Sequence, residues 1–437
     1  MSIPTLQGLQ TALSGLIAEQ QALDTTGNNI ANANTEGYTR ESVLMGSNTP
    51  IEIPATSSLT GQGAQLGTGV SVENIARIRN SYLDAQYRTQ NSTLSGATTQ
   101  SEELSQAQAA FNEPSNSGLA TQLSAFWSTW SELANTPNSG AAKEAVVEAG
   151  KQLAATFHEV SAQLTTISTQ AGEQYKAIAG PAGEVEDYAN QIAQLNGQIK
   201  QSEQAGVEPN DMLDRRDVLL DKLSSLAQIS VSEQPDGTDT VSFGNASKPL
   251  VEGTTVNWPQ TLTTAAGGKL GALLTLTSPT GALASYQTAL NGVAEKLAST
   301  VNALHSSTPF FSGKTASTLT VAVTAEQVQT SSTGAAGGND VARAIAALRG
   351  GAAEEGYATL VEQVGSGVRA AQDEQANMQT TVTAIDDERK SVSGVSLDEE
   401  MTNLISFQRG YQASARTLTA MDSMLETLIE HTGTVGL

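Results

Sequence analysis

The sequence contains no cysteine, few aromatic residues and few basic ones. Among 437 residues, aromatic side chains make up 4%, and 22 Lys and Arg stand against 45 Asp and Glu, which gives a net charge of −23. Without Cys, neither a disulfide framework nor a thiolate nucleophile or metal ligand is available. The acidic balance argues against binding to nucleic acid or to an anionic membrane surface, because both attract basic patches.

Long apolar runs are missing as well. No run of about 18 apolar residues occurs, so the sequence predicts no membrane-spanning helix. The N-terminal segment MSIPTLQGLQTALSGL has no small-residue cleavage site, and no Lys or Arg precedes Arg40, so it is not a standard secretory signal. Two interpretations stay open: a cytosolic soluble protein, or a protein exported by a route that uses no cleaved signal.

The residues that are abundant suit long helices. Hydrophobic residues make up 38% and charged residues 15%, and Ala, Ser, Thr, Gln and Gly carry most of the length. This composition is lean for one thick core and favours elongated helical bundles with narrow Ala/Leu seams. The length allows roughly two to four domains.

A seven-residue apolar repeat dominates the C-terminal segment. Alternating steps of four and three from Leu397 reach apolar residues except at Gln408 and Asp422, whose neighbours Phe407 and Met421 are apolar. Such a repeat is typical of a helix that packs along another helix, here over roughly 50 Å. The remaining members of the repeat are Met401, Leu404, Tyr411, Ala415, Leu418, Leu425 and Ile429.

The N-terminal segment has a similar repeat. Its members are Leu6, Leu9, Leu13, Leu16, Gln20, Leu23, Gly27 and Ile30. Pro4 is tolerated in a first helical turn, so a helix is expected from there to residue 31 or 32. The Asn- and Gly-rich residues 32–38 then end it, because Asn and Gly tolerate left-handed backbone.

Between the two ends the pattern predicts a mainly α protein with a β insert, an elongated α+β chain of several domains. We expect a terminal-helix domain of residues 1–38 and 396–437, an extended linker with short strands at 39–79, a helical bundle of 80–228 and 281–395 with a short strand and loop at 306–338, and an outer β-rich domain at 229–280. Within the β insert, 229–243 reads as a hairpin, with further extended pieces at 249–251, 255–258 and 270–276.

Few side chains suggest chemistry. Phe126, Trp127 and Trp130 are consistent with a ligand-stacking platform, but helical spacing favours a helix–helix core. The run Asp214–Arg215–Arg216–Asp217 is consistent with salt bridges or catalysis, and a solvated helix face is the commoner explanation. The histidines have no ligand-type spacing, and neither a phosphate-binding loop nor a nucleophile-elbow serine occurs. We therefore expect no enzyme and no cofactor.

Residues 12–40, ALSGLIAEQQALDTTGNNIANANTEGYTR, resemble the N-terminal motif of the rod, hook and hook-associated proteins of the bacterial flagellum. The part from Asn28 to Thr35 is specific to that family, which usually carries Pro where Glu36 stands. Residues 123–157, 212–243, 319–349 and 395–429 resemble the hook–filament junction members. Between His305 and Thr318 the chain has only SSTPFFSGKTAS, where larger members insert more structure, so a small outer part is expected.

The resemblance implies that the terminal helices pair as an inner coiled coil that lines the export channel. The helical bundle would form the next layer and the β insert the outermost one. The chain would assemble into the helical lattice of the flagellum, outside the cell, after export from the cytoplasm. Alternatives are another flagellar axial protein, such as the second junction protein or the hook protein, a secreted coiled-coil adhesin, or an exported enzyme.

Implied partners are other copies of the chain in a ring or helical lattice, the hook protein below, the second junction protein above, the export apparatus, and an export chaperone at about 396–437. Neither nucleic acid nor membrane insertion is expected. The expected assembly interface comprises Leu6, Leu9, Leu13, Leu16, Leu23, Asn28, Asn29, Ile30, Asn32, Asn34, Leu397, Met401, Leu404, Phe407, Tyr411, Leu418, Met421, Leu425, Leu428 and Ile429. Gln408 and Asp422, as polar breaks in the seam, would limit pairing in solution and set the register in the tube.

Overall fold

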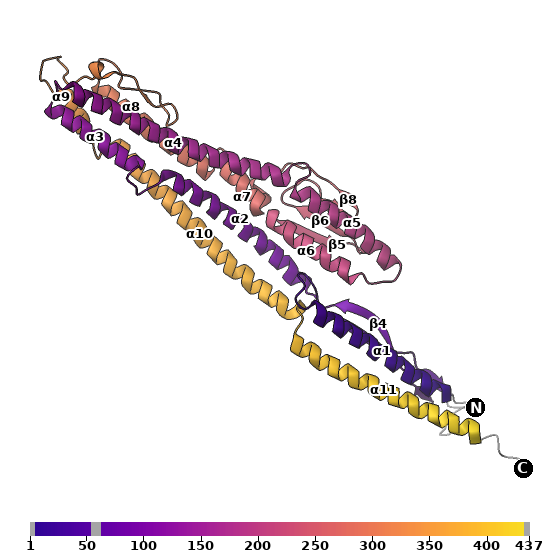
Figure 1. Ribbon diagram of the computed structural model, residues 1–437. Coiled ribbons are helices and arrows are strands. Elements are labelled where there is room, and N and C mark those ends of the chain that lie inside the picture. Colours follow the sequence, from indigo (N-terminus) through magenta and orange to yellow (C-terminus); the bar gives the residue numbers. More distant parts are fainter. Residues whose placement is uncertain (1–4, 54–62, 432–437) are drawn as a thin grey trace, which may run out of the picture.

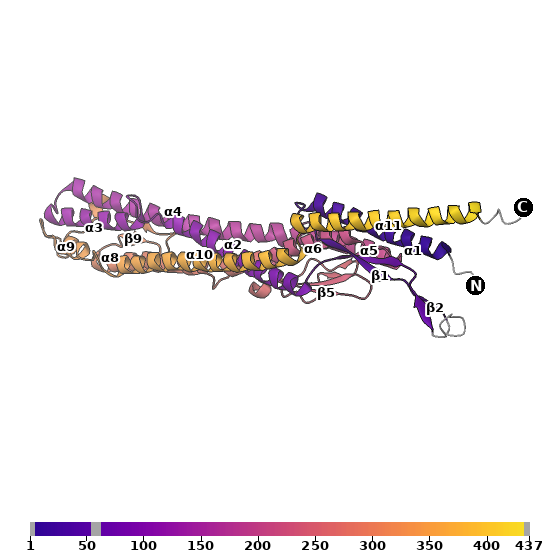
Figure 2. The same cartoon turned by 90° about the horizontal axis from the view of Figure 1, so that it is seen from below.

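The computed structural model describes residues 5–53 and 63–431 and shows a long, narrow molecule whose first and last helices lie together at one end (Figure 1). Helix α1 (Thr5–Asn32) runs beside α11 (Leu397–His431) at that end. The longer body extends away from this pair (Figure 2). The predicted pairing of the two terminal helices within one chain is therefore present.

The body is built mainly from long helices. Helix α2 packs along α10, α3 packs on α4 and α9, and α8 packs on α10. These helices are α2 (Ser81–Phe111), α3 (Leu119–Asn135), α4 (Gly140–Ala179), α5 (Glu184–Gln204), α6 (Asn210–Leu226), α7 (Gly268–Thr277), α8 (Ala282–Leu304), α9 (Asp340–Ala346) and α10 (Ala352–Ser393).

The aromatic cluster forms the core of the end farthest from the termini. Phe126, Trp127 and Trp130 are at most 1% exposed, and the ring of Phe310 lies 5.4 Å from that of Trp130. Burying an aromatic side chain contributes about 1.5–3 kcal/mol. The predicted helix–helix core is confirmed, and the ligand-stacking platform is wrong.

A four-stranded antiparallel sheet follows α6. Its strands are β5 (Ile229–Glu233), β6 (Asp239–Phe243), β7 (Val251–Glu252) and β8 (Thr255–Val256), in that order. The predicted hairpin is confirmed: Ile229 pairs with Phe243, and Gly237 takes the left-handed conformation (φ 75°) in the turn. The sheet lies partway along the molecule beside α5 and α6 (Figure 1). Its place as the outermost layer of an assembly stays a prediction.

Residues 270–276 are not extended, as the sequence had suggested, but belong to α7. Leu270, Leu273 and Leu276 are at most 2% exposed, and their spacing of three places them on one side of the helix. A short apolar run is compatible with a buried strand or a buried helix. Packing of α7 against α2 and α4 selects the helix.

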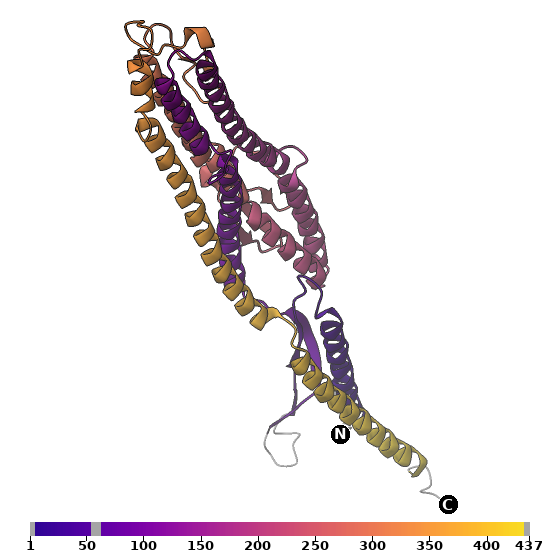
Figure 3. The same cartoon turned by 60° about the vertical axis from the view of Figure 1, so that its left-hand side comes forward.

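The linker contains the expected short strands. Strands β1 (Glu41–Ser47) and β4 (Val70–Arg77) pair antiparallel beneath α1, with an irregularity between Leu44 and Met45. Strands β2 (Ile51–Ile53) and β3 (Ala64–Leu66) form a hairpin that projects from the molecule (Figures 2 and 3). Strands β9 (Phe311–Ser312) and β10 (Thr320–Val321) lie in the loop expected at 306–338. The domain boundaries themselves stay a prediction.

Candidate assembly surface and its anchor

Helices α1 and α11 pack antiparallel along a seam in which both helices contribute small residues and α11 also contributes large apolar ones. A Cβ added to Gly8 would lie 2.4 Å from Met421 Cε, and one added to Gly15 would lie 3.0 Å from Ser414 Oγ. The absence of side chains at these glycines therefore allows the helices to approach closely. The half-buried residues along α11 are Leu404, Phe407, Gly410, Tyr411, Ser414, Ala415, Leu418, Met421 and Leu425.

The leucine repeat of α1 does not form the deepest part of this packing. Leu9, Leu16, Leu23 and Ile30 are only partly buried, Leu13 is 44% exposed, and the side chain of Leu6 lies outside the described residues. The fully buried residues of α1 are small or polar: Gln7, Ala12, Ala18, Ala22, Thr25, Thr26 and Asn29. The half-buried leucines of α1 therefore share its packing with these small and polar residues, because α1 packs against both α11 and the β1–β4 sheet.

Four predicted interface residues of α11 remain exposed in the monomer. Leu397 and Met401 are each 51% exposed, Leu428 is 52% exposed and Ile429 is 74% exposed. Gln408 and Asp422 are also exposed, because Phe407 and Met421 take their places in the seam. These two polar residues therefore lie outside the seam within one chain, and their expected effect on pairing between copies and on register stays a prediction.

Asn29 ties three segments of the terminal region together. Its Nδ2 donates hydrogen bonds to Glu41 O at 2.9 Å and to Glu400 Oε2 at 3.1 Å. Its Oδ1 accepts from Tyr38 Oη and from Glu41 N, both at 2.9 Å. Asn29 is 1% exposed and Glu400 2%, so the carboxamide uses both ends to join α1, β1 and the first turn of α11.

The other asparagines of the motif have different surroundings. Asn32 Nδ2 donates to Asn28 O at 3.1 Å and to Asn28 Oδ1 at 2.8 Å, and Asn32 Oδ1 accepts from Thr35 Oγ1 at 3.1 Å. Asn28 and Asn34 are exposed. These contacts shape the end of α1 and the turn after it, where Gly37 takes φ 78°.

A cluster of arginine and aspartate side chains, here called the clasp, joins this terminal region to the body. Thr39 donates from N and Oγ1 to Asp214 at 2.9 and 2.7 Å. Arg77 Nη1 bridges Asp214 and Asp217 at 2.7 and 2.8 Å. The clasp comprises Arg77, Arg79, Arg88, Arg389, Asp84, Asp214, Asp217 and Asp221.

The clasp draws its members from β4, the connection from β4 to α2, α2 itself, α6 and α10. Asp217 also contacts Arg79 and Arg88, each at 2.9 Å, and Arg389 reaches Asp221 at 2.7 Å. Burial alone would raise the pKa of Asp217, but the surrounding arginines lower it overall. Asp217 therefore stays ionised and holds the β1–β4 segment against the body.

The predicted solvated face at residues 214–217 is wrong. Asp214 and Asp217 lie in the clasp, whereas Arg216 meets Asp239 of β6 at 2.9 Å. Arg216 Nη1 also donates to Asn196 Oδ1 at 3.0 Å and to Gly237 O at 2.7 Å. Both faces of α6 use charges for internal contacts, which the sequence run alone could not distinguish from solvation.

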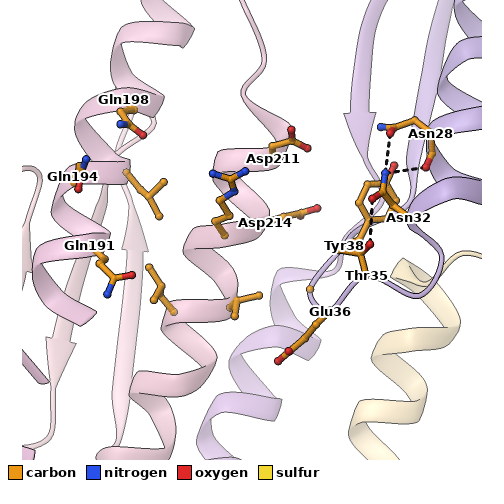
Figure 4. A pocket seen from close by; sticks show the side chains of 15 residues that line it. Asn28, Asn32, Thr35, Glu36, Tyr38, Gln191, Gln194, Gln198, Asp211 and Asp214 are labelled. Carbon is orange, nitrogen blue, oxygen red and sulfur yellow. Dashed lines mark hydrogen bonds between the residues drawn. The ribbon is translucent and has the colours of Figure 1, made fainter. Parts of the chain in front are cut away.

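A cleft of about 690 Å³ separates the turn after α1 from α5 and α6 (Figure 4). Asn28, Asn32 and Tyr38 line one side, and Gln194 and Gln198 line the other. A second space of about 730 Å³ lies between the same turn and residues 386–399. Clefts thus flank the turn on two sides, while at Gly37 the turn packs directly on Val218 of α6.

Among residues 5–53 and 63–431, no three His, Asp or Glu side chains are grouped so that they could hold a metal ion. Within the same ranges, none of the helices is long and apolar enough to cross a membrane. The arrangement offers apolar helix faces and amide groups, which are suited to contacts between proteins.

The two terminal segments match family models for flagellar rod proteins. Residues 9–39 match "Flagella basal body rod protein", and residues 391–430 match "Flagellar basal body rod FlgEFG protein C-terminal". These segments are α1 with its turn and α11, the two helices that pair. The fold and the paired ends thus define the class of flagellar rod- and hook-type proteins.

The matches that include the body identify a more specific family. Residues 104–265 match "Flagellar hook-associated protein FlgK helical domain". The chain is 31% identical over 512 aligned residues to flagellar hook-associated protein 1 of Bacillus subtilis (strain 168), an alignment that covers 99% of each protein. The chain belongs to the flagellar hook-associated protein 1 family. It is a structural protein of the flagellum, and the family is not one of enzymes.

Other relatives match over a shorter part. The proteins of the same name from Escherichia coli (strain K12) and Salmonella typhimurium are 32% identical over 56% of this chain, which is 43% and 42% of their lengths. A solved structure, of the flagellar hook junction protein FlgK from Burkholderia pseudomallei, aligns with 25% identity and a TM-score of 0.45 over 51% of this chain and 43% of that one.

Proposed function

We propose that this chain forms the junction between hook and filament by helical self-assembly, and that the α1–α11 pair makes the contacts between copies. The observation that carries the proposal is the apolar surface left over after the two helices pair. Leu13 and Ile17 on α1 are 44% and 50% exposed, and Met401, Ile405 and Met424 on α11 are 51%, 46% and 67% exposed. Contiguous exposed apolar surface on a soluble protein marks interaction sites.

The proposed partners follow from the family. Copies of the chain would surround the assembly axis, with hook protein below and the second junction protein above. Before export from the cytoplasm, a chaperone would cover about residues 396–437. Outside the cell, neighbouring copies would then cover the apolar side chains of α1 and α11.

A paired substitution on α11 tests this proposal. In cells that lack their own junction protein, Met401→Glu together with Ile405→Glu should abolish filament attachment and swimming. Both side chains are about half exposed, so the purified monomer should keep the unfolding midpoint of the parent chain.

Val207→Glu is the matched control, because Val207 is 59% exposed but lies between α5 and α6 on the body. This variant should support attachment. Normal attachment by the doubly substituted α11 chain would refute the assignment of the contacts to this helix pair.

A further inference from the structure

A groove lies between the start of α3 and the first part of α10. Figure 1 shows this part of the two helices on the body, far from the terminal pair. The volume of the groove is about 580 Å³, and its apolar surface comes from Pro114, Leu123, Tyr357, Ala358 and Val361. Leu123 and Tyr357 are 0% and 2% exposed, so the floor is part of the packed core. Pro114 and Ala358 are exposed at its edge.

Three carboxylates surround this apolar floor: Glu113, Glu354 and Glu362. Glu113 Oε1 accepts hydrogen bonds from Tyr357 Oη at 3.0 Å and from Ala120 N at 2.9 Å, and Glu354 accepts one from Gly350 N. These donors are neutral. Within the described part of the chain, no Lys or Arg pairs with any of the three carboxylates, and none lines the groove. The three carboxylates therefore have no ion-pair partner in the described part of the chain, since Arg349, which reaches the residue next to the groove-lining Leu123, donates to Ser124 Oγ at 3.0 Å instead.

We propose that the groove is a docking site for a segment of a partner protein that carries an apolar side chain flanked by Lys or Arg. The apolar floor would take the anchoring side chain, as concave apolar pockets do at interfaces. The carboxylates would form charge-assisted hydrogen bonds with the flanking cations. They would also repel acidic segments.

Charge also disfavours a second copy as the occupant. Each copy has a net charge of −23, so the copy would bring an acidic surface to an acidic rim. The groove shares no residue with the α1–α11 pair, and this proposal does not rest on the proposed junction role.

Binding of two designed peptides to the full-length chain tests the proposal. One is an amphipathic helix of Leu and Lys, and the other has Glu in place of each Lys, both carrying a fluorescent label. At physiological salt the Leu/Lys peptide should bind and the Leu/Glu peptide should not. Glu354→Gln with Glu362→Gln should weaken binding about tenfold, and Ala358→Gln, which fills the groove without changing charge, should weaken it to a similar extent.

Glu144→Gln with Glu148→Gln on α4 is the matched control, since both residues are exposed and lie outside the groove. This pair should change the dissociation constant less than about twofold. Three outcomes would show general charge attraction and overturn the proposal: an equal loss of affinity in the control, equal binding of the two peptides, or no effect of Ala358→Gln. Sedimentation gives a further check: if the parent chain self-associates and the Glu354→Gln/Glu362→Gln chain does not, the occupant is a second copy and the partner protein is excluded.

Discussion

At the scale of single residues, the motif NNIANANT contains one asparagine with a structural task that its neighbours do not share. Asn29 is buried and hydrogen-bonds to residues of β1, the turn and α11. Asn28 is exposed and makes a 3.5 Å contact to Glu41 Oε2. Both residues belong to the same family motif, so the sequence does not distinguish them. Their burial in the fold does.

Asn29→Ala should therefore loosen the first turns of α11. The substitution removes these four hydrogen bonds and leaves the buried Glu400 carboxylate without this donor, so we expect a loss of about 2–4 kcal/mol in docking of the helix. Hydrogen exchange of amides 397–404 measures it. Asn28→Ala should change protection by less than about 0.5 kcal/mol, and similar effects of the two substitutions would contradict the anchor role of Asn29.

Asp239 should give the sheet a distinctive pH dependence. Burial raises its pKa from 3.8 to about 6 despite the nearby Arg216. The folded state then binds a proton more tightly than the unfolded chain does, so this group adds stability as the pH falls from 7 to 5, by about 1 kcal/mol. The lowered pKa of Asp217 affects the stability only where the pH is below about 3.8, the ordinary pKa of this group.

Hydrogen exchange of β5 and β6, corrected for the intrinsic pH dependence, measures this gain. Asp239→Asn should flatten the change between pH 7 and 5, although it destabilises the sheet at both values because Arg216 loses its charge partner. An unchanged slope in Asp239→Asn would assign the pH dependence to other groups.

At the scale of elements, the close approach of α1 and α11 depends on glycines more than on leucines. Gly15→Leu should weaken the pairing, since even its Cβ would lie 3.0 Å from Ser414 Oγ. Gly27→Leu on the same helix is the control, because nothing lies within 4 Å of its added Cβ. Both substitutions raise helix propensity by about 1 kcal/mol, so a lower stability of α11 in Gly15→Leu alone, measured by hydrogen exchange, would isolate the packing effect. Equal stability of both variants would mean that the seam can widen freely.

At the scale of the whole molecule, the clasp controls how the terminal pair is held against the body. The turn after α1 is flanked by two clefts, but Gly37 packs directly on Val218 of α6 and Thr39 hydrogen-bonds to Asp214 of the clasp. Asp217 contacts three arginines of this cluster. Arg389 adds a further contact, its guanidinium lying 4.1 Å from the centre of the Tyr87 ring.

Asp217→Asn should loosen this connection. Removing one member of a buried ionic cluster leaves the others uncompensated and costs about 3–5 kcal/mol. Small-angle scattering should show a broader distribution of lengths for the variant in solution. Asp187→Asn, at an exposed position of α5, is the control and should scatter like the parent chain. If Asp217→Asn also scatters like the parent chain, the clasp does not hold the terminal pair.

Much of this architecture follows from the sequence. The seven-residue repeats and the Asn- and Gly-rich turn predicted both terminal helices, and alternation around residues 235–237 predicted the β5–β6 hairpin. Helical periodicity and turn chemistry depend on neighbouring residues, so they can be recognised without knowledge of the rest of the chain. The local sequences at residues 12–40, 123–157, 212–243, 319–349 and 395–429 also indicated the family. The comparison over 99% of the chain confirms it.

Only the tertiary structure decided which faces and side chains meet. Asn29 and Glu400 are 371 positions apart, and the charges at 214–217 divide between the clasp and the Arg216–Asp239 pair. An apolar or charged residue is compatible with several neighbours, and its environment is set by the elements that pack around it. The sequence alone determined the two terminal helices, and the fold determined that glycines, one asparagine and a group of buried ion pairs hold them in place.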